Sequence, residues 1–384
     1  MLIDDFNVLI DSPEILKRCA GYSDFQVLMS ALVDQLKRPG LEPDQLYEEI
    51  LKGNSRSIEP DINQFRHHWY PAGYSQNGEI NWRIKIAELP FAPFYDDRVS
   101  QLTCRSLLAT LIKPKLKLDY LLKHFNEFEE AAPAGFIFHL SRCGSTLLAN
   151  GLSATGRFSV LSEASFLTDL LLDSSLGFQD KVRALRMLLS LFNPSPVIKL
   201  NAWDIVYFSL IREAFPTTPI VFVIREPLEI LASHKRLTGI HMVPGTKVAH
   251  CLGQPATDSL LEYQAAVLQQ LMCLMFEHRS RGSPEYIRVI DYRQIDLEAL
   301  ERIAEFFGAK IPAMQMLDVS LMLQKNSKAP DDAFCPYAHN IVQNFDSNEI
   351  DKVADRLVPH YQKLKLSFVD FNTQKVSIAG YPAM

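Results

Sequence analysis

Short apolar strands alternate with helical segments from about residue 134 onward, and this alternation restricts the possible folds of the chain more than any other feature. The apolar runs lie at 136–140, 197–200, 219–224 and 285–290, and a stretch with helical spacing follows each of them. Because strands that are joined through helices run parallel, the pattern predicts an α/β fold with a doubly wound parallel sheet. Ligands of such sheets bind at the carboxyl ends of the strands. We therefore expect the chemistry just after residues 140, 200 and 224.

The first 130 residues have a different pattern. Apolar residues at 12–39 and 42–53 recur every three or four positions, which predicts amphipathic helices. The Asn-Gly pair at 77–78 is the favoured pair of a type I′ turn, and the alternating residues that follow it predict a β-hairpin. We therefore divide the chain into an accessory α+β region of unknown role at 1–130 and an α/β domain at 131–384.

Composition and charge exclude several classes of protein. The chain has 39 Lys and Arg against 45 Asp and Glu, a net charge of −6, and a phosphate backbone requires a basic face instead. Its six cysteines form no C-x-x-C pair, which is typical of a reduced, cytoplasmic protein. No segment reaches the roughly 18 to 20 apolar residues of a membrane helix, and Asp4 and Asp5 stand where a secretory signal is basic. We expect a cytoplasmic protein with neither a nucleic-acid partner nor a membrane span.

The segment 139–148, His-Leu-Ser-Arg-Cys-Gly-Ser-Thr-Leu-Leu, is the most informative motif of the chain. A predicted strand enters a turn of small residues, and a helix is expected to begin at Ser145 or Thr146. The free amides and the dipole of a helix N-terminus form an anion site. Gly144 allows the backbone to approach an anion closely, and Arg142 adds donors. The segment therefore predicts a loop that holds a phosphate group.

Two familiar phosphate-binding motifs differ from this loop. A Walker A loop has a lysine that reaches the β- and γ-phosphates, and Ser145 stands at that position. A thiol phosphatase has an arginine six residues after its nucleophilic cysteine, and the residue six places after Cys143 is Ala149. We do expect Cys143, next to Arg142 and a helix N-terminus, to be the most easily alkylated of the cysteines, because both neighbours favour a thiolate.

The loop resembles the 5′-phosphosulfate loop of the sulfotransferase superfamily, whose donor is 3′-phosphoadenosine 5′-phosphosulfate (PAPS). The family pattern is Pro-[Lys/Arg]-Ser-Gly-[Ser/Thr]-Thr, and this chain departs from it at Ser141 and Cys143. The arginine at the basic position is the version found in the tyrosylprotein and carbohydrate branches. The resemblance implies a sheet of the P-loop nucleoside-triphosphate-hydrolase type in 131–384. It also implies that PAPS is bound by Arg142, Cys143, Gly144, Ser145, Thr146 and Leu147.

A second motif lies in the segment 219–236, which resembles the family's 3′-phosphate segment. In the family a strand is followed by Arg-[Asn/Asp]-Pro and by a serine eight residues after the arginine. Here these residues are Arg225 and Ser233. Arg225 leaves the carboxyl end of a predicted strand, and Ser233 lies about two turns into the next helix, so both can reach one phosphate.

Two further segments resemble the family less closely. The stretch that begins at Arg288 is similar to the family's Val-x-Tyr-Glu-Asp-Leu segment, in which the tyrosine lines the adenosine. Tyr292 matches that tyrosine, and Gln294 stands one place after the usual glutamate. The stretch Gln-Lys-Asn-Ser-Lys-Ala-Pro resembles the late loop over the 3′-phosphate, with Ser327 and Lys328 as its candidate ligands.

Three residues are candidates for the chemical step: Glu163, Lys199 and Arg142. Glu163 follows the expected second strand, where the tyrosylprotein-like branch has a glutamate as general base; a solvated glutamate near a helix start is the alternative. Lys199 matches the lysine before the catalytic histidine of the cytosolic phenol-and-steroid branch. Asn201 stands where that histidine would be, which assigns the base to Glu163.

The resemblance implies transfer of a sulfuryl group from PAPS to a hydroxyl or amine of an unidentified small molecule, carbohydrate or peptide. A P-loop small-molecule kinase and a catalytically silent nucleotide-binding protein of the same fold are the alternatives. The ten histidines show no spacing typical of metal ligands, so we expect no metal. We interpret His139 as a strand histidine with its hydrogen bonds satisfied.

Overall fold

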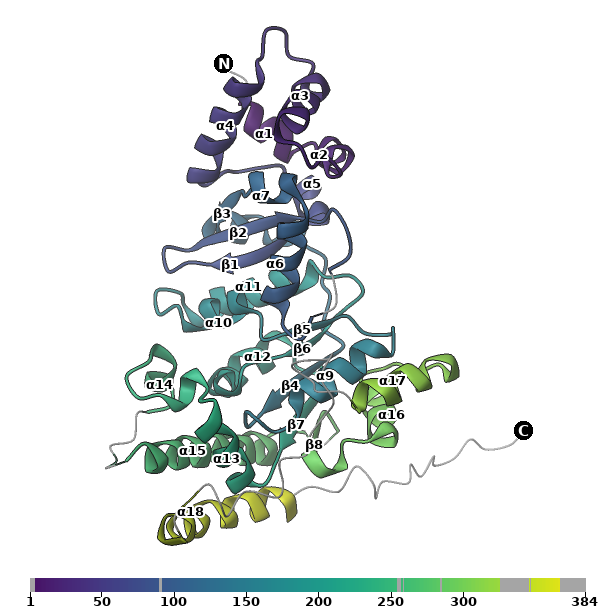
Figure 1. Ribbon diagram of the computed structural model, residues 1–384. Coiled ribbons are helices and arrows are strands. Elements are labelled where there is room, and N and C mark those ends of the chain that lie inside the picture. Colours follow the sequence, from purple (N-terminus) through teal and green to yellow (C-terminus); the bar gives the residue numbers. More distant parts are fainter. Residues whose placement is uncertain are drawn as a thin grey trace, which may run out of the picture. The chain divides into compact units, whose positions relative to one another are not determined.

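The chain forms two compact units in a computed structural model (Figure 1). The first unit comprises Met1–Pro133, Leu161–Ile198 and Ser209–Pro216, and the second comprises Ala134–Val160, Lys199–Phe208 and Thr217–Met384. The first unit thus includes stretches beyond the accessory region predicted at 1–130. The structure describes residues 4–89, 92–253, 257, 259–283, 285–324, 345 and 347–366.

The first unit begins with a group of short helices, drawn in purple in Figure 1. They are α1 (Asp5–Ile10), α2 (Pro13–Cys19), α3 (Phe25–Leu36), α4 (Pro43–Ser55) and α5 (Ile62–His68). Polar side chains begin several of them: the Asp24 carboxylate accepts a 2.9 Å hydrogen bond from the amide of Val27 at the start of α3. The helices predicted at 12–39 and 42–53 are therefore confirmed, with a break between α2 and α3.

A β-hairpin follows, and it belongs to a three-stranded antiparallel sheet in the order β1-β2-β3. The strands are β1 (Trp69–Tyr74), β2 (Glu79–Ile84) and β3 (Lys115–Lys117). The predicted hairpin is confirmed, but the prediction of a type I′ turn is wrong. Gly78 has a φ of 72°, while Asn77 stays outside the left-handed region, and the amide of Gly78 donates to the carbonyl of Ser75 at 2.9 Å. This is a three-residue loop with a bulge at Gly78, and the Asn77 Oδ1 accepts from the amide of Glu79 instead.

The rest of the first unit packs around aromatic side chains. Its other helices are α6 (Tyr95–Arg105), α7 (Leu107–Leu111), α8 (Leu118–Lys123), η1 (Phe125–Glu127), α10 (Ser165–Leu172), α11 (Phe178–Ser190) and all but the first residue of α12 (Phe208–Ala214). Tyr95 is fully buried, and its ring meets those of Phe166 and Phe192 edge-on. Its hydroxyl donates to the carbonyl of Pro71 at 2.6 Å, which ties α6 to β1.

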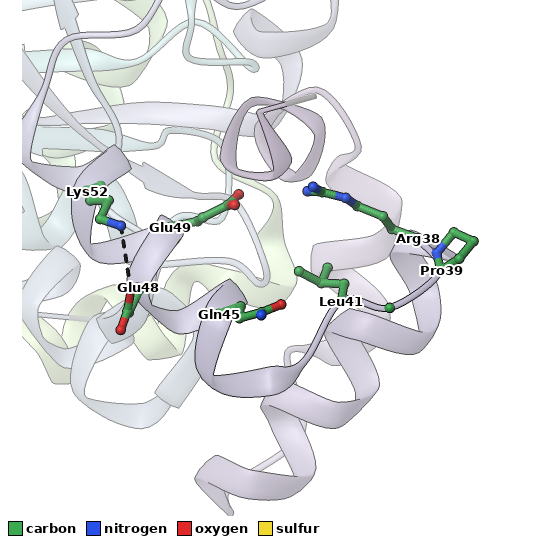
Figure 2. A pocket seen from close by; sticks show the side chains of 8 residues that line it. Arg38, Pro39, Leu41, Gln45, Glu48, Glu49 and Lys52 are labelled. Atoms are coloured by element: carbon green, nitrogen blue, oxygen red, sulfur yellow. Dashed lines mark ion pairs between the residues drawn. The ribbon is translucent and has the colours of Figure 1, made fainter. Parts of the chain in front are cut away.

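A surface hollow of about 240 Å³ lies between the end of α3 and α4 (Figure 2). Its lining mixes both signs of charge: Lys52 pairs with Glu48 at 3.6 Å, and Arg38 pairs with Asp5. None of the predicted site residues lines it. The lining residues are Arg38, Pro39, Gly40, Leu41, Gln45, Glu48, Glu49 and Lys52.

The larger sheet has five strands in the order β5-β6-β4-β7-β8. They are β4 (Gly135–His139), β5 (Val160–Ser162), β6 (Val197–Lys199), β7 (Ile220–Ile224) and β8 (Ile287–Asp291). β4 pairs with β7 and β7 with β8, in parallel. All residues of β4 and β7 are buried, as their continuous apolar sequences predict. The predicted α/β fold with a parallel sheet is therefore confirmed.

Two groups of helices lie on either side of β4, β7 and β8 in Figure 1. One group contains α9 (Ser145–Ala154), α16 (Leu297–Phe306) and α17 (Met316–Leu323), and the other contains α13 (Pro227–Arg236), α15 (Leu260–Arg281) and α18 (Ser347–Leu366). Of the helices in the described ranges, none is both long and apolar enough to cross a membrane. The short elements of this unit are η2 (Ala202–Tyr207), η3 (Ile240–Met242), α14 (Lys247–Cys251), η4 (Tyr292–Gln294) and η5 (Ala313–Gln315).

Candidate active site

The predicted phosphate loop joins β4 to α9 through a sharply bent backbone. Ser141, Arg142 and Gly144 all have left-handed conformations, with φ of 63°, 47° and 83°. Gly144 is the N-cap of α9, which begins at Ser145 as predicted. A Cβ atom on Gly144 would lie 2.4 Å from the ring of Tyr292, so only glycine fits there. The loop therefore places the N-terminus of α9, where amides lack helical partners, at the carboxyl edge of the sheet.

His139 connects this loop to the neighbouring strand. Its ring is buried, and Nδ1 accepts a 3.0 Å hydrogen bond from the amide of Ser141. Its Nε2 lies 2.9 Å from the carbonyl oxygen of Leu200, just after β6. Since Nδ1 accepts and a carbonyl can only accept, the ring is neutral with its proton on Nε2. The predicted strand histidine is confirmed, and its ring also supports the first left-handed residue of the loop.

Cys143 points into the protein rather than toward solvent. Its side chain is fully buried, and Sγ donates to the carbonyl of Val223 on β7 at 3.2 Å. Burial raises the pKa of the Cys143 thiol to about 11, although the charges of Lys199 and Arg225 act in the opposite direction. The expectation of a favoured, easily alkylated thiolate is therefore wrong, because loss of hydration outweighs the helix N-terminus and the nearby cations. A nucleotide could meet the backbone amide of Cys143, but the buried thiol faces β7.

Arg142 bridges the loop and the segment after α13. Its Nη2 donates to the carbonyl of Leu237 at 2.7 Å. Its own carbonyl accepts a 3.1 Å hydrogen bond from Nη1 of Arg225, the residue that follows β7. The loop is thus linked through one residue to both ends of α13.

Arg225 lies against the loop as the second motif predicts. Its guanidinium lies 4.3 Å from the centre of the Tyr292 ring, and its Nε donates to the Glu229 carboxylate at 2.7 Å. Ile224 of β7 pairs with Asp291 of β8, and Arg225 and Tyr292 are the residues that follow these two. The parallel pairing therefore brings the Arg225 guanidinium to the Tyr292 ring. The structure therefore brings together four residues that the sequence placed in one site: Arg142, Gly144, Arg225 and Tyr292.

Glu229 and Arg293 join this group, although no sequence motif marked either of them. The two carboxylate oxygens of Glu229 accept from two different arginines, Arg225 and Arg293, the latter at 2.8 Å. Burial alone would raise the pKa of Glu229, but these hydrogen bonds outweigh it and hold the pKa below its ordinary value. The i, i+4 spacing of Arg225 and Glu229 is a signal that could have predicted the first pair. No comparable signal marks Arg293.

Lys199 and Asn201 lie at the end of β6. The Lys199 side chain is buried, and its positive charge acts against the rise in the pKa of the Cys143 thiol. Asn201 begins η2: its amide donates to the Asp204 carboxylate at 2.8 Å, and its side chain completes a capping box. The residue at the family's histidine position thus has a capping role.

Three further predicted residues lie on α13, in η4 and just after β5. Ser233 is half-buried on α13, and Gln294 caps η4 by accepting from the amide of Asp291 at 3.0 Å. Glu163 follows β5 in the first unit with a φ of 51°, a left-handed conformation that is uncommon for glutamate. Ser327 and Lys328 lie outside the described residues.

Within the described ranges, no three His, Cys, Asp or Glu side chains come together in a way that could hold a metal ion.

Several solved structures are similar to this chain. A sulfotransferase from Alicyclobacillus acidocaldarius is 15% identical, with a TM-score of 0.40 over 62% of this chain and 96% of its own. Mouse sulfotransferase SULT7A1 complexed with PAP is 11% identical, with a TM-score of 0.38 over 65% and 94%. Sulfotransferase STF9 from Mycobacterium avium is 11% identical, with a TM-score of 0.42 over 85% and 97%. No family model matches the sequence, and no curated protein does.

Proposed function

We propose that this protein is a PAPS-dependent sulfotransferase of the α/β class. One observation carries the proposal: Arg225, which follows β7, donates a hydrogen bond to the carbonyl of Arg142 in a strand–loop–helix anion motif, and its guanidinium lies on the ring of Tyr292, the residue after β8. This arrangement joins a candidate site for one phosphate group, at the N-terminus of α9, to a candidate site for a second. A donor whose ribose carries a phosphate at the 3′ position and a phosphosulfate at the 5′ position requires such a pair.

In this proposal each element of the site binds a different part of the donor. The amides at the start of α9 hold the 5′-phosphosulfate, with Ser145 and Thr146 as further donors. Arg225 and Ser233 bind the 3′-phosphate, and Tyr292 lines the adenosine. Ser327 and Lys328 are assigned to the 3′-phosphate by their sequence alone.

When bound, PAPS supplies a sulfuryl group attached to a good leaving group. Glu163 takes the proton of the acceptor hydroxyl or amine while a bond forms between the acceptor and sulfur. Lys199 stabilises the charge that develops on the bridging oxygen as the bond from sulfur to that oxygen breaks. Arg142 and the loop amides stabilise the equatorial oxygens. Positioning and electrostatic stabilisation thus supply the rate enhancement, as in phosphoryl transfer.

Calorimetric titration with 3′-phosphoadenosine 5′-phosphate (PAP), ADP and magnesium ATP tests the proposal. Charge-assisted hydrogen bonds contribute about 1.5–3 kcal/mol each, so we expect PAP to bind at least about tenfold more tightly than ADP. Arg225→Ala removes most of this preference. Arg281→Ala is the matched control, because Arg281 also forms an i, i+4 pair with a glutamate but lies at the end of α15.

Each alternative gives a different result. Equal affinity of the wild type for PAP and ADP contradicts the proposal, and tight binding of magnesium ATP alone indicates a kinase. If PAP binds but no sulfated product forms from PAPS across a panel of alcohols, phenols, sugars and tyrosine peptides, the protein is a silent relative.

A further inference from the structure

A buried carboxylate balances the charge of Arg225, the residue that the proposed function assigns to the 3′-phosphate. Arg225 is largely buried, with 15% of its side chain exposed, and it is paired with a Glu229 carboxylate that is 7% exposed. The formal charges of these two residues cancel. Glu226, the N-cap of α13, adds a carboxyl group whose pKa is raised by burial. A 3′-phosphate is a dianion at neutral pH, and this pair attracts it less strongly than an arginine without a neighbouring carboxylate would.

A second guanidinium lies at the same carboxylate. Arg293 Nη2 donates to Glu229 Oε1 at 2.8 Å, while Arg225 Nε donates to Oε2 at 2.7 Å. The two arginines follow adjacent strands, because Ile224 of β7 pairs with Asp291 of β8. Arg293 is the residue after Tyr292, whose ring supports Arg225. The side chain of Arg293 is 62% exposed, so an anion from solvent can reach it without displacing buried groups.

We propose that Arg293 is a specificity-determining residue that, together with Arg225, binds the 3′-phosphate of the donor; this inference rests on the proposed function. The group formed by Arg225, Glu229 and Arg293 carries one more positive charge than the buried pair of Arg225 and Glu229 alone. The hydrogen bond to Glu229 uses one of the five donor hydrogens of Arg293. Glu229 therefore holds the two guanidinium groups at a common point, and Arg293 supplies the attraction.

Calorimetry with PAP and ADP on Arg293→Ala and Arg293→Lys tests this inference. Arg293→Ala is expected to weaken PAP binding by about twofold to fivefold, which is the effect expected for the loss of a contact between exposed charges. ADP, which lacks the 3′-phosphate, is expected to bind as it does to the wild type. Arg293→Lys keeps the charge without the fork of donors, so it restores part of the preference for PAP. Arg281→Ala serves again as the control.

The dependence on salt separates binding from a structural role. If Arg293 attracts the 3′-phosphate, the PAP-to-ADP preference of the wild type declines with added salt more steeply than that of Arg293→Ala. A wild type that prefers PAP and an Arg293→Ala variant with the same preference would overturn the inference and leave the proposed function intact. An equal loss of PAP and ADP affinity would also overturn it, because that result indicates a general structural effect. A wild type without any preference for PAP would instead contradict the proposed function.

Discussion

Replacing His139 by asparagine or by glutamine separates the two hydrogen bonds of its buried ring. Asparagine places an acceptor oxygen where Nδ1 stands, so it keeps the bond from the Ser141 amide and loses the bond to Leu200. Glutamine places a donor where Nε2 stands, so it keeps the bond to Leu200 and loses the bond from Ser141. The two variants are therefore matched in polarity, and they differ in which of the two hydrogen bonds of His139 they remove.

The expected magnitudes follow from burial and backbone conformation. His139 is 5% exposed, so each lost bond leaves a buried polar group without its partner, at a cost of about 1–3 kcal/mol in the free energy of unfolding. In the glutamine variant the unsupported amide is that of Ser141, whose φ of 63° is itself an unfavourable conformation. The loop then relaxes before it can bind an anion. We expect the glutamine variant to lose about fivefold to a hundredfold in PAP affinity, and the asparagine variant much less.

Calorimetric PAP affinity and thermal unfolding, measured on both variants, check this expectation. Similar losses of stability with unequal losses of affinity would support the assignment of the Ser141 bond to the loop. If the asparagine variant lost as much PAP affinity as the glutamine variant, the bond to Ser141 would not hold the loop in its binding conformation. The reasoning would also be refuted if neither variant bound PAP less tightly than the wild type.

Three further predictions concern Cys143, Glu229 and Glu163. Mass spectrometry after brief alkylation of the native protein is expected to find exposed Cys104 modified well before buried Cys143; early modification of Cys143 would contradict its burial. Glu229→Gln is expected to lower the unfolding temperature at pH 7, and its difference from wild type is expected to shrink as the pH falls below 4.5. A carboxylate whose pKa is lowered in the folded protein stabilises the fold at pH values above its ordinary pKa, and it loses that contribution when it is protonated. Glu163→Gln is expected to slow turnover by about 10²- to 10⁴-fold with unchanged PAP affinity; nearly full turnover would place the base elsewhere.

The elements of the site could be predicted from the sequence because each has a local signal. Continuous apolar runs indicated buried parallel strands, and β4 and β7 are buried throughout. A turn of small residues after the strand indicated a helix that begins at Ser145 or Thr146, and α9 begins at Ser145. The hairpin at 77–78 shows the limit of such signals. The side chain of Asn77 binds a backbone amide of the turn, and this competing bond selects a bulged loop over the type I′ turn.

The direction of Cys143 could not be predicted, for a physical reason. Ser141 and Arg142 have left-handed backbones, and residues of these types adopt that conformation only when surrounding contacts impose it. Those contacts come from Leu200, Val223 and Arg225, which are distant in the chain. The local sequence around Cys143 indicated an exposed thiol at a helix N-terminus, but the bend that turns it inward is set by tertiary structure.

The same contacts explain how the loop is held ready for an anion. His139 ties it to the residue after β6, and the Arg225 guanidinium and the Cys143 thiol tie it to β7 and the residue after it. The unfavourable left-handed bend therefore forms when the protein folds, so the loop does not have to rearrange when a ligand binds. Amides that are fixed in advance in this way give strong electrostatic stabilisation. Arg142 differs, because its Nη2 is committed to the carbonyl of Leu237. In the proposed reaction its guanidinium contacts a sulfuryl oxygen with its remaining donors, so we expect the backbone amides to carry the larger share of the stabilisation.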